Sequence, residues 1–330
     1  MTTAVSSLQI DVLEPVVLGG VLQWIRVRGA DRDNPVLLLM QQGPGLPIIN
    51  DVPRFDHRLG LEQIFTVVYW DQRGTGLSAR SLHNRQDRLD ITVTNMVHDT
   101  IDVLEMLHDR YERKTFIAGF SFGATFAAYA AVKRPDLVAA LIAVGMDIDV
   151  PAAERHTYQF ALDTARRRNN VRAIHQLESI GPPPHLTSKQ FRTRAKWAAN
   201  FGGVTRDATF NSLLRSWLSS SLRSQDYSTA DVLRTIRGLA AAQAALLPQL
   251  ADTDLVRTVP SLDVPLVMVQ GQLDQVAPAT PAQRFYDSVT APSKRLIWFE
   301  DSAHTPQLDQ PDKFRDVLLD VAHAHRRATA

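Results

Sequence analysis

Cysteine is absent from this chain of 330 residues. Without cysteine the protein can form no disulfide, no thiolate metal site and no catalytic thiolate. Cysteine is thereby removed as a rival to any other nucleophile in the sequence. No cofactor and no metal ion is expected.

An excess of charge of one sign is also lacking. The 36 Lys and Arg residues nearly balance the 35 Asp and Glu residues, and the formal net charge is +1. The densest basic cluster, residues 166–168, is interpreted as the solvated face of a helix, and no basic block is interleaved with aromatic residues. Nucleic acid is therefore not an expected partner.

Long hydrophobic runs are missing as well. No apolar run approaches the length needed to span a bilayer, and residues 1–10 contain neither basic residues nor a continuous apolar stretch. Neither a signal peptide nor binding to a membrane is expected. The sequence predicts a soluble, cytoplasmic protein that acts on a small-molecule substrate, and it says nothing about the oligomeric state.

The first half of the chain alternates between strand and helix patterns. Alternating polar and apolar residues predict an antiparallel pair, and the apolar runs that follow are continuous, as in a sheet covered on both faces. The expected elements are strands at 9–15 and 22–28 with a turn at Gly19-Gly20, strands at 35–40 and 65–70, a helix at 92–110, and a strand, a helix and a strand from Thr115 to Gly145. This order predicts the first half of a doubly wound α/β sheet.

The strand pattern stops near residue 149 and is replaced by helical segments rich in Ala, Arg and Leu. Strands resume at 264–271 and 294–299, and a last helix begins near Pro311. We interpret the interruption as a helical cap inserted between core strands. The predicted division is a core made of 1–148 and 258–330, with the cap at 149–257.

One apolar strand leads into a serine turn. The run from Thr115 ends in Gly119-Phe-Ser-Phe-Gly123 and continues into an alanine-rich helix. A Gly-x-Ser-x-Gly turn between a buried strand and a helix is the nucleophile elbow of serine hydrolases. The turn strains the serine backbone, so the residues two positions before and after it must be nearly free of side chain. Ser121 is therefore the candidate nucleophile.

A serine hydroxyl needs a base to take its proton and an acid to orient that base. In α/β-hydrolases both follow the serine along the chain, the acid first. Asp274 comes directly after the predicted strand at 264–271, and His304 lies on the loop after the strand at 294–299. We expect Asp274 to be the acid and His304 to be the base.

Two other aspartates are rival candidates for the acid. Asp301 is too close in sequence to His304 to approach it easily from a separate strand end. Asp147 follows the strand that ends at Gly145, so it also stands at a strand end and remains a real alternative.

Acyl transfer also needs backbone N–H donors for the oxyanion. One is expected from Phe122, the residue after the nucleophile, and the other from the loop at 41–47, which follows the strand that ends at Met40. The place of this loop directly after a core strand favours that role over a flexible Pro-Gly turn.

Three stretches of the sequence together resemble one family. They are the elbow, the Gly43-Pro-Gly45 loop and Trp70-Asp-Gln-Arg-Gly-Thr-Gly-Leu-Ser78. They look like the proline iminopeptidase-related (peptidase S33-like) branch of the α/β-hydrolases, which shows His-Gly-Gly-Pro-Gly, then Asp-Gln-Arg-Gly-x-Gly-x-Ser, then the elbow. The resemblance implies an α/β-hydrolase fold, with a mostly parallel, doubly wound eight-stranded sheet and an inserted helical cap domain.

The resemblance also assigns roles to residues. It makes Ser121 the nucleophile, Asp274 the acid and His304 the base, with the amides of Phe122 and of Gln42 or Gly43 as the oxyanion hole. The motif from Asp71 to Ser78 is expected to shape the floor beside the site through an Asp-Arg network and tight glycine turns. Gln41-Gln42 stands where the family has His-Gly.

An iminopeptidase must recognise a protonated amine, and burying an unpaired ammonium is costly. Such recognition would need a carboxylate that faces the serine from the cap. Glu154 is the first candidate among the cap carboxylates, and Phe120, next to the nucleophile, is a second candidate for contact with substrate.

The sequence therefore predicts a serine hydrolase that forms an acyl-enzyme and cleaves an amide or ester of a small, largely apolar substrate. Aminopeptidase-like amide cleavage is one hypothesis, and hydrolysis of an ester or lactone of a secondary metabolite is another. A hypothesis from a different class is a degenerate ligand-binding protein of the same fold, in which the Gln41-Gln42 loop has spoiled the oxyanion hole.

Overall fold

The structure, a computed structural model, describes residues 8–82 and 90–329, so residues 1–7, where no signal peptide is expected, lie outside it. Its centre is an eight-stranded sheet in the order β1-β2-β4-β3-β5-β6-β7-β8. β2 pairs antiparallel with β1 and β4, and all other neighbouring strands pair parallel. The strands are β1 (Ile10–Leu18), β2 (Val21–Gly29), β3 (Val36–Met40), β4 (Thr66–Asp71), β5 (Thr115–Phe120), β6 (Val138–Val144), β7 (Leu266–Gly271) and β8 (Lys294–Phe299).

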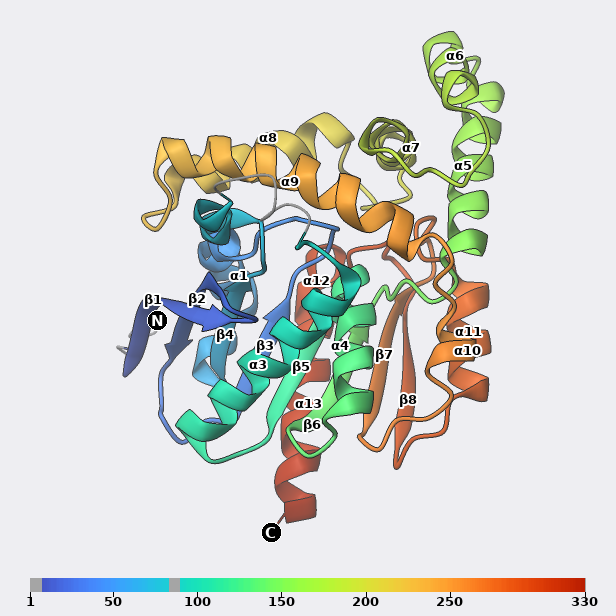
Figure 1. Cartoon of the computed structure of the whole chain (residues 1–330). Coiled ribbons are helices and arrows are strands. Elements are labelled where there is room, and N and C mark those ends of the chain that lie inside the picture. Colours follow the sequence, from blue (N-terminus) through green and yellow to red (C-terminus); the bar gives the residue numbers. More distant parts are fainter. Residues whose placement is uncertain (1–7, 83–89, 330) are drawn as a thin grey trace, which may run out of the picture.

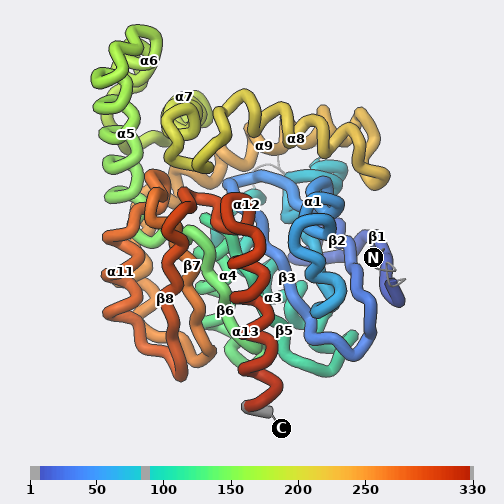
Figure 2. Tube along the Cα trace, turned by 180° about the vertical axis from the view of Figure 1, so that it is seen from behind, coloured from blue at the N-terminus to red at the C-terminus, as the bar shows by residue number. Residues whose placement is uncertain are grey.

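Helices cover both faces of the sheet (Figures 1 and 2). One face packs against α3 (Val93–Tyr111), α4 (Phe122–Lys133) and α11 (Ala279–Ser288), and the other against α1 (Val52–Leu59) and α13 (Pro311–Thr329). Successive strand residues enter opposite cores, as Phe116 and Ile117 do. Because both faces are buried, the inner strands are continuous apolar runs. Shorter elements are α10 (Leu255–Thr258), α12 (Pro306–Asp309) and the 3-10 helices η1 (Ile49–Asp51), η2 (Leu61–Gln63) and η3 (Gly76–Ser81).

Between β6 and β7 the chain leaves the sheet and forms a layer of helices. They are α5 (Val150–Arg167), α6 (Val171–Ile180), α7 (Ser188–Asn200), α8 (Phe210–Arg223) and α9 (Thr229–Leu250). In Figure 1 this layer lies above the upper edge of the sheet, with α8 and α9 side by side along it. These five helices, which we call the cap layer, fill the segment expected to be the cap. The division into domains stays a prediction.

The predicted fold class is confirmed by the eight-stranded, mostly parallel sheet with helices on both faces. Every core strand and helix expected from the sequence is present, but α1 and α11 were not predicted. They have 8 and 10 residues, too few for a helical period to stand out. In the part of the chain that the structure describes, no helix is both long and apolar enough to cross a membrane.

The parallel strands β5, β6, β7 and β8 are neighbours, so their carboxyl ends share one edge of the sheet. The segments that follow these four ends carry Ser121, Asp147, Asp274 and His304 respectively. The topology alone therefore brings these side chains to one place.

Candidate active site

Ser121 stands at the turn between β5 and α4. Its backbone has φ 54° and ψ −126°, a strained conformation for a residue with a Cβ. A Cβ on Gly119 would collide with the backbone of Ala124, and one on Gly123 would collide with the carbonyl oxygen of Gln41. The two glycines therefore let the strand, the helix and the loop after β3 close around the serine, as the motif predicts.

Asp274 and His304 lie side by side, with 2.9 Å between Asp274 Oδ2 and His304 Nδ1. The same oxygen accepts from Gln270 Nε2 at 3.3 Å, and Oδ1 accepts from the amides of Val276 and Ala277 at 2.7 and 2.9 Å. Because an ionised carboxylate can only accept hydrogen bonds, Nδ1 carries the proton of a neutral His304 ring. Nε2 is then the nitrogen that can take a proton from a nucleophile.

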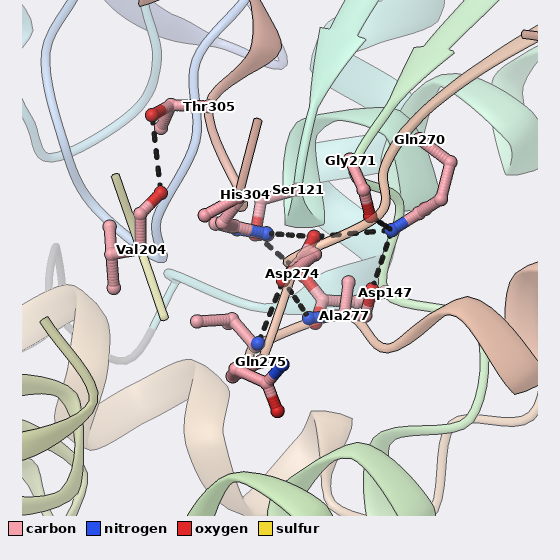
Figure 3. A network of polar contacts seen from close by, with 12 residues as sticks. Ser121, Asp147, Val204, Gln270, Gly271, Asp274, Gln275, Ala277, His304 and Thr305 are labelled. Carbon is pink, nitrogen blue, oxygen red and sulfur yellow. Dashed lines mark hydrogen bonds and ion pairs between the residues drawn. The ribbon is translucent and has the colours of Figure 1, made fainter. Parts of the chain in front are cut away.

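The hydroxyl of Ser121 donates to a different carboxylate. It lies 2.7 Å from Asp147 Oδ2, whereas no hydrogen bond joins Ser121 to His304 within the described residues. Figure 3 shows Ser121, Asp147, Asp274 and His304 gathered in one polar network. The structure thus brings the predicted nucleophile, acid and base together, and it adds the rival acid Asp147 as a direct partner of the serine.

Burial and charge shift the pKa of two groups in this network. Burial raises the pKa of Asp147 to about 6, and the charge of His304 and the hydrogen bond from Ser121 act in the opposite direction. Burial alone would lower the pKa of His304, but the charge and hydrogen bond of Asp274 and the charge of Asp147 outweigh it, so this pKa lies above the ordinary histidine value. The imidazolium form of His304 is therefore stabilised by two carboxylates.

The predicted oxyanion residues lie beside the elbow. Phe122 is the first residue of α4. Gln42 and Gly43 stand in the loop after β3, and the carbonyl oxygen of Gln41 in this loop lies against Gly123. On its other side this loop packs against α9, because a Cβ on Gly45 would meet the side chain of Ala242. The loop therefore fits between the elbow and the cap layer, and donation to an oxyanion by its amides stays a prediction.

The motif that begins at Asp71 holds the far end of this loop. Oδ1 of Asp71 accepts from the amides of Ile48 and Ile49 at 2.9 and 3.1 Å. Oδ2 accepts from the amide of Leu77 at 2.8 Å and from the hydroxyl of Tyr227, just before α9. One buried carboxylate thereby ties the loop, the motif and the cap layer together. That the motif forms the floor beside the site stays a prediction.

The Asp-Arg network expected for this motif does not include Asp71, whose carboxylate holds the loop. It is formed by Arg73 and Asp99. Arg73 donates from Nη2 to Oδ1 and from Nε to Oδ2 of Asp99 on α3, at 2.7 and 2.8 Å. Both side chains are buried, and the bidentate pair fixes the motif to the helix behind it.

Glu154, the first candidate for amine recognition, lies on α5 and is 6% exposed. One carboxylate oxygen forms an ion pair with Arg194 of α7, and the other accepts from the amide of His185 at 3.1 Å. Both oxygens are therefore engaged inside the cap layer. Contact of Glu154 with a substrate amine stays a prediction.

Arg194 was not singled out from the sequence. It is buried on α7 together with Trp197 and Ala198, three and four positions further on. Residues at this spacing share one helix face. An arginine one turn before a tryptophan in a predicted helix is the sequence signal that could have pointed to a buried Arg194.

Two further candidates lie apart from the network. The ring of Phe120 packs between Phe55 of α1 and Phe314 of α13 in the core, and its contact with substrate stays a prediction. Asp301 has a side chain 68% exposed and pairs with Arg206 at 2.9 Å, so the structure does not place it on His304.

Comparison with known proteins places this site in a family context. Residues 58–311, more than half of the chain, match the family described as serine aminopeptidase, S33. The sequence is 29% identical over 318 residues to the probable aminopeptidase YbaC of Bacillus subtilis, covering 96% of this chain and 98% of that protein.

Within the described residues, no three His, Asp or Glu side chains gather in a way that could hold a metal ion.

Solved structures show the same fold at lower identity. The proline iminopeptidase of Mycobacterium smegmatis aligns with a TM-score of 0.67 and 19% identity, covering 97% of this chain and 100% of that one. The esterase EaEST of Exiguobacterium antarcticum aligns with a TM-score of 0.61 and 18% identity, covering 94% and 98%. At this identity the likeness concerns the fold, which serves both peptidases and esterases.

Proposed function

Since the chain belongs to the serine aminopeptidase S33 family of α/β-hydrolases, as its sequence motifs indicate, we propose that it is a serine hydrolase that works through an acyl-enzyme. Ser121 is the nucleophile, His304 the general base and Asp274 the acid that orients it. The observation that carries this proposal is the 2.9 Å contact of Asp274 with His304 Nδ1, beside a serine on a strained elbow.

The reaction begins when the Ser121 hydroxyl turns from Asp147 toward Nε2 of His304. Its oxygen attacks the substrate carbonyl carbon while its proton passes to His304. Amides of Phe122 and of Gln42 or Gly43 stabilise the oxyanion. The tetrahedral intermediate then breaks its bond to the leaving amine or alcohol, which takes the proton from the imidazolium.

Water completes the cycle. It attacks the acyl-enzyme and gives a proton to His304, and the second tetrahedral intermediate releases the carboxylic acid as Ser121 regains its proton. Both halves of the reaction place a positive charge on His304. The raised pKa of this ring, held up against burial by Asp274 and Asp147, supports that role.

We propose that the scissile bond is an amide or ester of a small, largely apolar acyl group. Aminopeptidase-like cleavage is supported by the family match and by the probable aminopeptidase of Bacillus subtilis. Esterase or lactonase activity is the second candidate. The observation in its favour is the Gln41-Gln42 pair, which stands where the resembled family has His-Gly. The Gln41 side chain is buried in this loop, and its Nε2 has no hydrogen-bond partner among the described residues.

A fluorophosphonate probe tests the proposal, since it labels a serine only when the base and the oxyanion hole activate it. Labelling of the purified protein at Ser121, its loss in Ser121→Ala, and its persistence after chelation of metal ions are the expected results. Absence of labelling would favour the degenerate ligand-binding alternative. Turnover of matched arylamides, aryl esters and lactones then separates the peptidase from the esterase.

A further inference from the structure

We propose that Asp147 is the carboxylate that binds the α-ammonium group when an aminoacyl ester or amide occupies the site. This inference rests on the serine hydrolase proposed above and assigns its amine-recognition residue. It moves amine recognition from the cap to the core, from Glu154 to the segment that follows β6.

Asp147 is fixed in place by the nucleophile helix. Its backbone carbonyl accepts from Thr125 Oγ1 of α4 at 2.9 Å, and its side chain reaches the Ser121 hydroxyl at 2.7 Å. The residue is 5% exposed. The carboxylate therefore lies directly beside the oxygen that attacks the substrate.

The hydrogen bonding of Asp147 is incomplete, whereas that of Asp274 is not. Asp274 receives four hydrogen bonds, two on each oxygen. Within the described residues Asp147 receives one, on Oδ2 from the neutral hydroxyl of Ser121, and Oδ1 receives none. A carboxylate that serves only the protein architecture would be satisfied by its neighbours as Asp274 is. Asp147 instead keeps unused acceptor capacity on a carboxylate that touches the nucleophile.

Charge at the site leads to the same conclusion. Asp274 neutralises the imidazolium that forms on His304 during turnover, and Glu154 neutralises Arg194 in a direct ion pair. The charge of Arg194 acts on Asp147 but is offset by Glu154. Asp147 forms no direct ion pair with a described residue; its charge acts through space on His304, which Asp274 already binds. Buried charges are paired in proteins, and a substrate ammonium would supply the missing partner.

The distances allow this pairing during acylation. An α-amino nitrogen lies roughly 2.5 Å from the carbonyl carbon, given the N–Cα and Cα–C bond lengths. The attacking oxygen approaches that carbon to about 3 Å. Asp147 Oδ2 is 2.7 Å from that oxygen before the hydroxyl turns to His304. When the Cα of the acyl group lies on the Asp147 side of the carbonyl, these lengths allow the ammonium to reach the carboxylate.

Binding of the ammonium would also free the nucleophile. Ser121 donates its hydrogen to Asp147 in the described structure, and an ammonium is a stronger, charged donor for the same oxygen. Once displaced, the hydroxyl can turn to Nε2 of His304. The amino group should therefore increase kcat as well as lower KM.

A matched substrate pair tests the inference on the unaltered protein. Proline benzyl ester and benzyl cyclopentanecarboxylate differ only by the ring nitrogen, and esters report on the acyl group even if amides are not cleaved. We expect kcat/KM to favour the prolyl ester by at least about 30-fold, the size expected for a buried charge pair. Equal rates, or a preference for the carbocyclic ester, would overturn the inference.

Variants locate the effect. Asp147→Asn should remove most of the preference, and Asp301→Asn, which changes an exposed carboxylate paired with Arg206, should keep it. A uniform loss on both esters in Asp147→Asn would show a structural or proton-transfer role and refute amine recognition. Loss of the preference in Glu154→Gln while Asp147→Asn keeps it would return recognition to the cap.

Fluorophosphonate labelling distinguishes a failure of the proposed serine hydrolase from a failure of amine recognition by Asp147. If the parent protein is not labelled at Ser121, the proposed serine hydrolase itself fails. If Ser121 is labelled and the ester pair shows no preference, the function stands and amine recognition by Asp147 is refuted. The substrate pair needs no variant, so the inference is tested even if Asp147→Asn does not fold.

Discussion

The side chains of Ser121 and Asp147 meet across two adjacent parallel strand ends, those of β5 and β6, in a hydrogen bond of 2.7 Å. The backbones are tied at the same place, because the amide of Ser121 donates to the carbonyl of Val144 at 2.9 Å. Thr125 of the following helix holds the Asp147 carbonyl at 2.9 Å. The elbow and Asp147 therefore form one rigid unit, and the carboxylate can affect both the reactivity of the serine and the stability of the fold.

Ser121→Ala and His304→Ala are each expected to lower kcat by at least about a thousand-fold, because each removes one member of a single proton-transfer unit. The double variant should lose little more than either single variant. Steady-state kinetics on one ester, with circular dichroism to show that the fold is intact, measures this. Additive losses, or a single variant that keeps more than about a tenth of the parent rate, would contradict the triad.

Asp274→Asn should also lower kcat by about a thousand-fold or more, because an amide in this place no longer holds His304 in the required tautomer. Asp301→Asn is the control. Its side chain is 68% exposed and bound to Arg206, so its activity should match the parent. An inactive Asp301→Asn together with an active Asp274→Asn would show that Asp274 is not the catalytic acid.

The gathering of Ser121, Asp274 and His304 could be predicted because strand ends in a parallel sheet must share an edge. Each of Ser121, Asp274 and His304 follows a strand that is visible as an apolar run. Which of the neighbouring carboxylates would touch the serine could not be predicted. That depends on the direction in which the chain leaves β6 after Gly145, where φ is +51°.

The cap could be recognised as helical but not packed from the sequence. Glu154 and Arg194 are 40 positions apart on two helices, and their ion pair depends on how α5 and α7 cross. Local periodicity gives the buried face of each helix and says nothing about its partner. The sequence therefore names Glu154 as a first candidate without showing which way it faces, and it does not reveal the ion pair with Arg194.

Hydrolysis of a neutral ester should rise with pH through the pKa of His304, since the ring must be unprotonated to accept the Ser121 proton. This midpoint should lie above the ordinary histidine value, because Asp274 and Asp147 outweigh the opposing effect of burial. Asp147→Asn removes one of these charges and should move the midpoint to lower pH. A pH profile of kcat/KM for both proteins measures the shift, and a midpoint moved upward would contradict the electrostatic role of Asp147.

Asp147→Asn should stabilise the fold at alkaline pH. Burial raises the pKa of Asp147 to about 6, so the folded protein favours the protonated carboxyl. The resulting contribution to the free energy of unfolding is full below the ordinary carboxyl pKa and is lost as the pH rises through about 6. Asparagine does not titrate, so the variant does not lose this contribution as the pH rises. A shift of roughly two pKa units corresponds to at most about 3 kcal/mol in the free energy of unfolding.

Thermal unfolding at about pH 8 and pH 4.5 tests this difference. Asp147→Asn should have the higher Tm at pH 8, and its advantage should shrink at pH 4.5. A carboxylate retained for the architecture would give the opposite result, a lower Tm at pH 8 in the variant. The outcome therefore tells whether Asp147 is kept for function at a cost in stability.

Removal of Glu154 should act through Arg194. In Glu154→Gln the buried guanidinium loses its ion-pair partner, so the free energy of unfolding should fall by about 3–5 kcal/mol. In Glu154→Gln combined with Arg194→Met no uncompensated charge remains, and most of that stability should return.

Chemical denaturation of the parent, both single variants and the double variant measures the coupling between Glu154 and Arg194. The values of kcat/KM for the proline and cyclopentane esters report on amine recognition. If Glu154 serves only to hold Arg194, the double variant recovers its stability and keeps the preference for the free amine. If Glu154 itself binds the amine, the double variant recovers its stability but still loses that preference, and the assignment of recognition to Asp147 is wrong.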